Sequence, residues 1–145
     1  MVRGICLSAA IAALAACQAG PEAGDNVPGT SPEGFTGIAE DETIIFGGTE
    51  PFWGGEVQGT QLTCSTPENP DGTQIAVERF VGQGGISFSG TLFEEGFDMT
   101  VTPGECSDGM SDRTYPYTVT VIVGETQLNG CAHTDQQPFE GPETP

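Results

Sequence analysis

The sequence predicts an all-β domain: a small antiparallel meander of about seven strands that closes into a barrel or a sandwich. Apolar residues in the middle of the chain recur at every second position, whereas a helix would repeat them about every 3.6 residues. Short breaks rich in Gly, Pro and Asn separate these segments, as tight turns between antiparallel strands require. Because each strand has one apolar face, the sheet must curl or pair to cover it.

The alternation is clearest in two segments. Residues 97–102 alternate three apolar with three polar side chains, and residues 117–123 place an apolar side chain at every odd position. Residues 75–80 and 86–92 repeat the pattern, and the shorter candidate strands are residues 43–46, 56–64 and 127–131. The predicted turns are residues 69–72, 82–85, 94–96 and 124–125, because they hold the residue types that tight turns favour.

The first 16 residues predict an export signal. Arg3 supplies one positive charge, an apolar stretch covers residues 4–14, and the small residues Ala15 and Ala16 precede Cys17. This stretch is too short to span a bilayer as a helix. The pattern is typical of a bacterial lipoprotein signal, so we expect cleavage before Cys17 and a diacylglycerol on its thiol. The alternative is an ordinary secretory signal cut after Ala16 or Ala19.

An acylated Cys17 would decide where the protein works. Each buried methylene of an acyl chain contributes about 0.8 kcal/mol, so two or three chains hold a protein to a membrane almost permanently. In a Gram-negative cell, Gln18 after the cysteine favours delivery to the outer membrane. We therefore expect the protein in the cell envelope, on the periplasmic face of the outer membrane.

Composition divides the rest of the chain. Residues 17–40 follow the signal and are rich in Gly, Pro, Glu, Ser and Thr. Such a segment buries too little apolar surface to fold, so we expect a flexible tether. The β domain is predicted over residues 41–135, and residues 136–145 are predicted to form a disordered tail.

The chain is strongly acidic, with a net charge of −18 and no lysine. Once Arg3 leaves with the signal, Arg79 and Arg113 oppose 21 acidic residues. Such a surface repels nucleic acid and would attract cations or basic proteins. The simpler interpretation is that the acidic residues keep an exported protein soluble.

Three cysteines remain for the domain after Cys6 leaves with the signal and Cys17 accepts lipid. In an oxidising compartment we expect a disulfide between Cys106 and Cys131, because it would tie the loop before residue 117 to the end of the last strand. Cys64 would then be a buried free thiol or an intermolecular partner.

Three motifs carry a family resemblance: GTEPFW at residues 48–53, CSDGMSDRTYPY at residues 106–117 and LNGCA at residues 128–132. Together they resemble a family of uncharacterised bacterial envelope lipoproteins, over nearly the whole folded region. The resemblance implies a compact β domain with the Cys106–Cys131 bridge, sometimes found beside lysozyme-inhibitor or META-type heat-shock modules. It implies no established reaction, and Cys64 lies outside the motifs.

The motif residues form the candidate ligand-binding or structural site. Phe52 and Trp53 are large apolar anchors after Pro51, and we expect them to close one end of the barrel. Asp108 is expected to accept backbone amide bonds in its turn, and Arg113 is expected to pair with a nearby acid. The full candidate set is Glu50, Phe52, Trp53, Asp108, Asp112, Arg113, Tyr115 and Tyr117.

Other chemistries have weaker signals. Glu105, Asp108 and Asp112 lack the order of an EF-hand calcium loop, and zinc on Cys64, Cys106, Cys131 and His133 would need reduced thiols. His133, the only histidine, is expected to be solvated, and no catalytic or cofactor-binding motif accompanies it. We therefore expect a non-enzymatic, membrane-anchored module without a cofactor that binds a small ligand or a protein or supports envelope integrity. The alternatives are an inhibitor of a cationic lysozyme and a carboxylate-based hydrolase.

Overall fold

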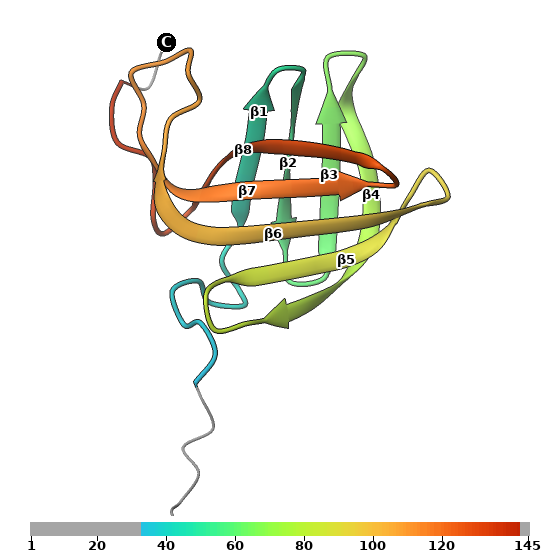
Figure 1. Cartoon of the computed structure of the whole chain (residues 1–145), viewed down its shortest axis with the longest axis horizontal. Coiled ribbons are helices and arrows are strands. Elements are labelled where there is room, and N and C mark those ends of the chain that lie inside the picture. Colours follow the sequence, from blue (N-terminus) through green and yellow to red (C-terminus); the bar gives the residue numbers. More distant parts are fainter. Residues whose placement is uncertain (1–32, 143–145) are drawn as a thin grey trace, which may run out of the picture. The chain divides into compact units, whose positions relative to one another are not determined.

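The computed structural model describes residues 33–142, and these residues form a closed antiparallel barrel of eight strands (Figure 1). The predicted all-β meander is confirmed, since each strand pairs with its neighbour in the chain and β1 also pairs with β8. The strands are β1 (Ile44–Thr49), β2 (Phe52–Gln58), β3 (Gln61–Thr66), β4 (Asn69–Val81), β5 (Ile86–Leu92), β6 (Glu95–Cys106), β7 (Tyr115–Val123) and β8 (Thr126–Thr134).

Side chains fill the barrel. In Figure 1, β5–β8 cross in front of β1–β4, so that the two halves of the wall face each other across the core. The alternation seen in the sequence sets which side chains point inward: Phe97, Met99 and Val101 of β6 are at most 1% exposed. Val121 and Val119, the register partners of Met99 and Val101 on β7, are 2% and 1% exposed. The core is therefore a packed apolar interior of the kind that small barrels of eight strands form.

The structure corrects one predicted strand. Residues 56–64 contain the end of β2, a turn at Gly59 and Thr60, and the start of β3. Gly59 has a φ of 57°, which glycine adopts without steric cost. The prediction missed this turn because a single glycine between two polar residues is a weak signal, and one strand became two.

Two predicted turns are displaced. Residues 69–72 belong to β4, and the preceding turn is at Pro67 and Glu68. A bulge between Cys64 and Thr66 shifts the register there, so the Pro- and Gly-rich residues lie in an irregular strand end instead of the turn itself. The β5–β6 turn is Phe93–Glu94, which starts one residue and ends two residues before the predicted turn at residues 94–96. The turns at residues 82–85 and 124–125 match the prediction.

The domain extends beyond residues 41–135 at both ends. Ile38, predicted in the tether, is 3% exposed in the core, and Phe35 packs against the same cluster. After β8, the Gln137 side chain accepts a hydrogen bond from the Tyr117 hydroxyl at 2.7 Å and donates one to the Gly37 carbonyl. The expectations of a tether to residue 40 and a disordered tail from residue 136 are therefore wrong for residues 35–40 and 136–142, because apolar and polar anchors dock both segments on the barrel.

Polar contacts also hold the segment before β1 to the barrel. The Arg79 guanidinium lies on the same face as Phe88 and donates to the Ile38 carbonyl at 3.1 Å. The fully buried Thr134 hydroxyl donates to the Glu42 carboxylate at 2.6 Å. Burial alone would raise the pKa of Glu42, but hydrogen bonds from Ala39, Thr134 and Gln137 outweigh it and lower that pKa.

Signal cleavage and acylation at Cys17 concern residues outside the described range. Within residues 33–142, no helix has the length and apolar character needed to cross a membrane.

Candidate functional site

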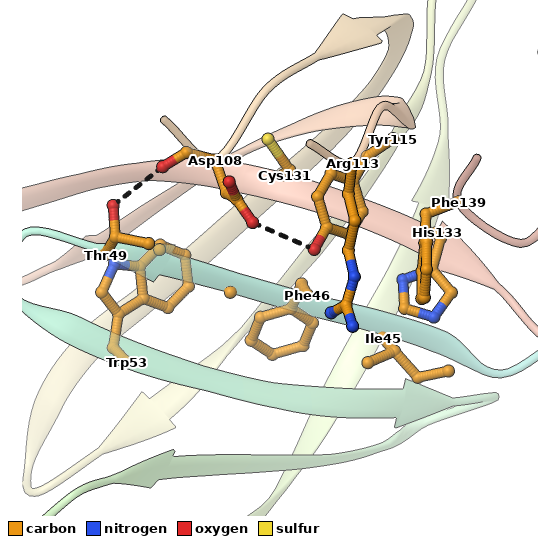
Figure 2. Close-up of a pocket in the computed structure, with 12 residues that line it drawn as sticks. Ile45, Phe46, Thr49, Trp53, Asp108, Arg113, Tyr115, Cys131, His133 and Phe139 are labelled. Carbon is orange, nitrogen blue, oxygen red and sulfur yellow. Dashed lines mark hydrogen bonds between the residues drawn. The ribbon is translucent and has the colours of Figure 1, made fainter. Parts of the chain in front are cut away.

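A cleft of about 300 Å³ lies on the outer surface of the barrel, between β1, β8 and two covering segments. Figure 2 shows its lining residues, which come from β1 and β2, from the connection between β6 and β7, from the start of β7, from β8 and from the C-terminal segment. Ile45 and Thr49 belong to the outward-facing row of β1, because the alternate residues Ile44 and Phe46 are buried in the core. The barrel wall thus forms the floor of the cleft.

The predicted disulfide fixes the covering connection to this floor. Cys106, at the end of β6, bonds to Cys131 on β8, with Cα atoms 5.6 Å apart. This bridge confirms the expected pairing. Cys131 also lines the cleft. The bridge therefore sets where residues 107–114 leave the barrel and how closely they cover β1 and β8.

Asp108 organises the covering connection. Its carboxylate accepts hydrogen bonds from the backbone amides of Met110 and Ser111 at 2.9 and 2.8 Å, and from the Ser111 hydroxyl at 2.7 Å. The Tyr115 hydroxyl adds a longer bond of 3.3 Å. These donors, Ser111 first, lower the pKa of Asp108 from 3.8 to about 2. The Asp108 carbonyl accepts from the Thr49 hydroxyl, which joins the loop to β1.

Arg113 extends down into the cleft towards β1 in Figure 2. Its Nε donates to the Pro142 carbonyl at 2.8 Å, and its guanidinium carbon lies 4.4 Å above the centre of the Phe139 ring. A stacked arginine of this kind gains a cation–π attraction. Arg113 thereby joins the covering connection to the C-terminal segment.

His133 and Phe139 complete an aromatic wall with Tyr115. The ring centres lie 5.3 to 5.9 Å apart, and the His133 and Phe139 rings meet edge to face. Burial first, and the charge of Arg113 second, lower the pKa of His133. The expectation that His133 is solvated is wrong, because β8 continues to Thr134 and Phe139 packs over the imidazole.

The aromatic pair of the first motif is divided. Trp53 is partly buried, packs against the core and lies 6.0 Å from the Phe46 ring. A Cβ at Gly48 would lie 2.3 Å from the Trp53 Nε1 atom. Only glycine at this position therefore leaves room for the indole to pack against β1. Phe52 is 54% exposed. The expectation that both rings close one end of the barrel is wrong for Phe52, which faces the other side of β2 from Trp53.

The structure brings together only part of the predicted set. Trp53, Asp108, Arg113 and Tyr115 line the cleft. Glu50 and Asp112 are exposed and do not line it, and Tyr117 points into the barrel. Sequence reasoning missed five lining side chains: Ile45, Phe46, Thr49, His133 and Phe139. Phe139 had one usable signal, since it is the single large apolar residue in an otherwise polar C-terminal stretch.

A second cleft of about 450 Å³ shares the Gly47–Thr49 edge, Asp108 and Cys131 with the first, and continues over β7. Its other side chains are mainly hydroxyl and amide groups, including Thr118, Thr120 and Asn129. The contact between Thr49 and Asp108 involves residues that line both clefts.

The structure does not place the residues of the calcium and zinc alternatives as a metal site would require. In the described part of the chain, no group of three His, Cys, Asp or Glu residues is placed to hold a metal ion. Cys106 and Cys131 are joined in the disulfide and cannot serve a zinc site. Cys64 is a free thiol, and burial raises its pKa to about 11, which disfavours the reactive thiolate.

Comparison of the chain with protein-family models, with curated proteins and with solved structures finds no match in any of the three.

Proposed function

We propose that this protein is a lipid-anchored envelope protein whose β domain binds a small ligand in the cleft between the barrel wall and the disulfide-held connection. The cleft is the main observation in favour of ligand binding. Its volume of about 300 Å³ is at the lower end of the range of small-molecule sites. Its walls combine aromatic rings with a few polar groups, as such sites usually do. The matching ligand is a small molecule with an apolar ring.

Three observations support the location. Residues 1–17 have the charge, the apolar stretch and the small residues of a lipoprotein signal. The Cys106–Cys131 disulfide suits an oxidising compartment outside the cytoplasm. The excess of acidic residues disfavours binding to nucleic acid.

The chemistry of Asp108 favours binding over hydrolysis. A catalytic carboxylic acid needs a pKa near the working pH, whereas hydrogen bonds hold the pKa of Asp108 at about 2. Its acceptor positions are used by the loop that contains it. Asp108 therefore serves to shape the cleft, and a proton-transfer role has no geometric support.

Location is tested by expressing the full chain and a Cys17→Ser variant in a Gram-negative host. We expect the parent chain in the outer-membrane fraction, with a mass that includes acyl chains on residue 17, and the variant in the soluble fraction or unprocessed. An unmodified amino terminus on the parent chain would contradict the anchor. Inner-membrane recovery of an acylated chain would contradict only the outer-membrane assignment.

Binding is tested with anilinonaphthalene sulfonate, a fluorescent probe that carries aromatic rings. Trp53 is the only tryptophan and lines the cleft, so its emission reports occupancy directly. We expect saturable binding that quenches Trp53 and weakens at least several-fold in Phe139→Ala. Phe80→Ala is the matched control, since Phe80 is 69% exposed on β4 and does not line the cleft. Equal binding by both variants would contradict the assignment.

A carboxylate hydrolase makes an opposite prediction. Alanine at Asp108, Asp112 or Glu50 would then abolish turnover without lowering the melting temperature. The binding proposal expects a lower melting temperature for the Asp108 variant alone, because Asp112 and Glu50 are exposed.

A further inference from the structure

The β5–β6 turn presents an aromatic side chain at a conformational cost. Phe93 and Glu94 form this two-residue turn with φ angles of 52° and 67°. Turns with two positive φ angles strongly prefer Asn-Gly or similar pairs, and a bulky residue in this region is an outlier. Phe93 is also 74% exposed, the highest value among the exposed large hydrophobic residues of the described chain. Neither local geometry nor burial accounts for phenylalanine at this position.

Acidic side chains surround this ring in the sequence and in space. Glu94 and Glu95 follow Phe93 directly. The Gly124 amide of the β7–β8 turn donates to the Gly96 carbonyl at 2.9 Å, which brings Glu125 to the same end of the barrel. A Cβ at Gly124 would lie 2.7 Å from a carboxylate oxygen of Glu95, so that side chain lies over the neighbouring turn. In the described residues 33–142, the arginines are Arg79 on β4 and Arg113 in the connection between β6 and β7, and neither belongs to this turn.

This tip is separate from the cleft. Figure 1 shows the β5–β6 turn projecting on one side of the barrel, while the connection between β6 and β7 and the C-terminal segment lie on the opposite side. A second binding surface at the tip would therefore leave the cleft accessible.

We propose that the Phe93 tip is a docking surface for a basic protein with an apolar pocket rimmed by Lys or Arg. An exposed aromatic residue that enters a pocket is the typical anchor of a protein interface. The carboxylates of Glu94, Glu95 and Glu125 supply the complementary charge, which speeds encounter and selects a cationic partner. The same carboxylates repel nucleic acid and anionic membranes. The backbone strain at Phe93 is retained because it holds the ring outward on a rigid hairpin.

The test uses variants that improve the turn. Phe93→Asn removes the ring and places there a residue that tolerates positive φ, and Glu94→Gly relieves the second position while leaving the ring in place. We expect both to raise the melting temperature, by roughly 4 °C each if each relieves about as much strain as such positions usually store. Because both variants fold at least as well as the parent chain, lost binding cannot be attributed to unfolding.

The probe is a basic lysozyme immobilised on a sensor surface, with poly-L-lysine as a control for charge alone. We expect the parent chain to bind lysozyme at low salt, Phe93→Asn to bind about 30-fold more weakly, as for an interface anchor, and Glu94→Gly to weaken only a few-fold. Binding to poly-L-lysine should change little in Phe93→Asn. The proposal is overturned if the parent chain is not retained on lysozyme, or if Phe93→Asn binds it as tightly as the parent chain.

Discussion

Replacing Asp108 by Asn tests whether one carboxylate holds the connection over the cleft. Asn keeps an oxygen that can accept from the Met110 and Ser111 amides but loses the charge that strengthens those bonds. Lowering a carboxyl pKa from 3.8 to about 2 corresponds to roughly 2.5 kcal/mol. Because the loop is partly open to water, screening reduces this to about 1 kcal/mol. We therefore expect the melting temperature of Asp108→Asn to fall by roughly 5 °C at pH 7.

The pH dependence gives the sharper test. A carboxyl group with a lowered pKa stabilises the folded state fully above its ordinary pKa, and this contribution disappears as the pH falls through the folded-state value. The difference between the parent chain and Asp108→Asn should thus be complete at pH 7 and 5, smaller at pH 3 and nearly absent at pH 2. Circular dichroism melts at these four pH values measure it.

Asp112→Asn is the matched control, because it makes the same charge change on an exposed residue of the same connection. We expect its melting temperature to stay within about 2 °C of the parent value, as for most surface substitutions. Equal melting temperatures for the parent chain and Asp108→Asn at pH 7 would refute the reasoning. A gap that did not close in acid would show that shape, and not charge, makes the contribution.

Three further predictions concern the same domain. Replacing both Cys106 and Cys131 by Ser should lower the free energy of unfolding by about 3.5 kcal/mol in urea titrations, the chain-entropy estimate for a loop closed across 25 residues; a loss below about 1 kcal/mol would contradict it. At pH 8, a maleimide reagent should label Cys64 slowly in the native chain and rapidly in denaturant, since its pKa is about 11 and it is partly buried; peptide mapping should find Cys106 and Cys131 unlabelled without reductant. Because the pKa of His133 is lowered, the unfolded chain takes up this proton first, so stability falls as the pH drops below about 6.5; His133→Phe should lose part of that slope between pH 7.5 and 5.5, and an unchanged slope would show that the imidazole is not buried against Phe139.

Turn chemistry shows where sequence reasoning reaches its limit. The turn at Gly124 can be predicted from the sequence, because glycine adopts its φ of 57° without steric cost. The turn at Phe93 and Glu94 is not, because neither residue favours positive φ, and the prediction moved it toward Gly96. Pairing of β5 with β6 over seven register pairs imposes that conformation. Local preference gives way where many cross-strand contacts outweigh it.

The cleft shows a second limit. Tyr115, Arg113 and Asp108 are neighbours in the chain, so their association was predictable from one motif. His133 joins them because β8 pairs with β1. Phe139 joins them because the C-terminal segment folds back, where the Thr114 and Glu140 backbones pair and Gln137 bonds to Tyr117. Composition marked this segment as unable to fold, since it buries little apolar surface by itself. It is ordered by a surface that the rest of the domain supplies.

The period of two in the apolar residues by itself determined that this chain forms an antiparallel meander, because strands place alternate side chains on opposite faces. The cysteine count and the oxidising compartment implied by the signal pointed to the Cys106–Cys131 bridge. Only the tertiary structure decided that there are eight strands, that β1 pairs with β8 and that the His133 ring packs against Phe139. The physical reason is the sequence separation of the contacts. Periodicity and turn preference reflect residues a few positions apart, whereas the cleft depends on contacts between distant segments that closure of the barrel brings together.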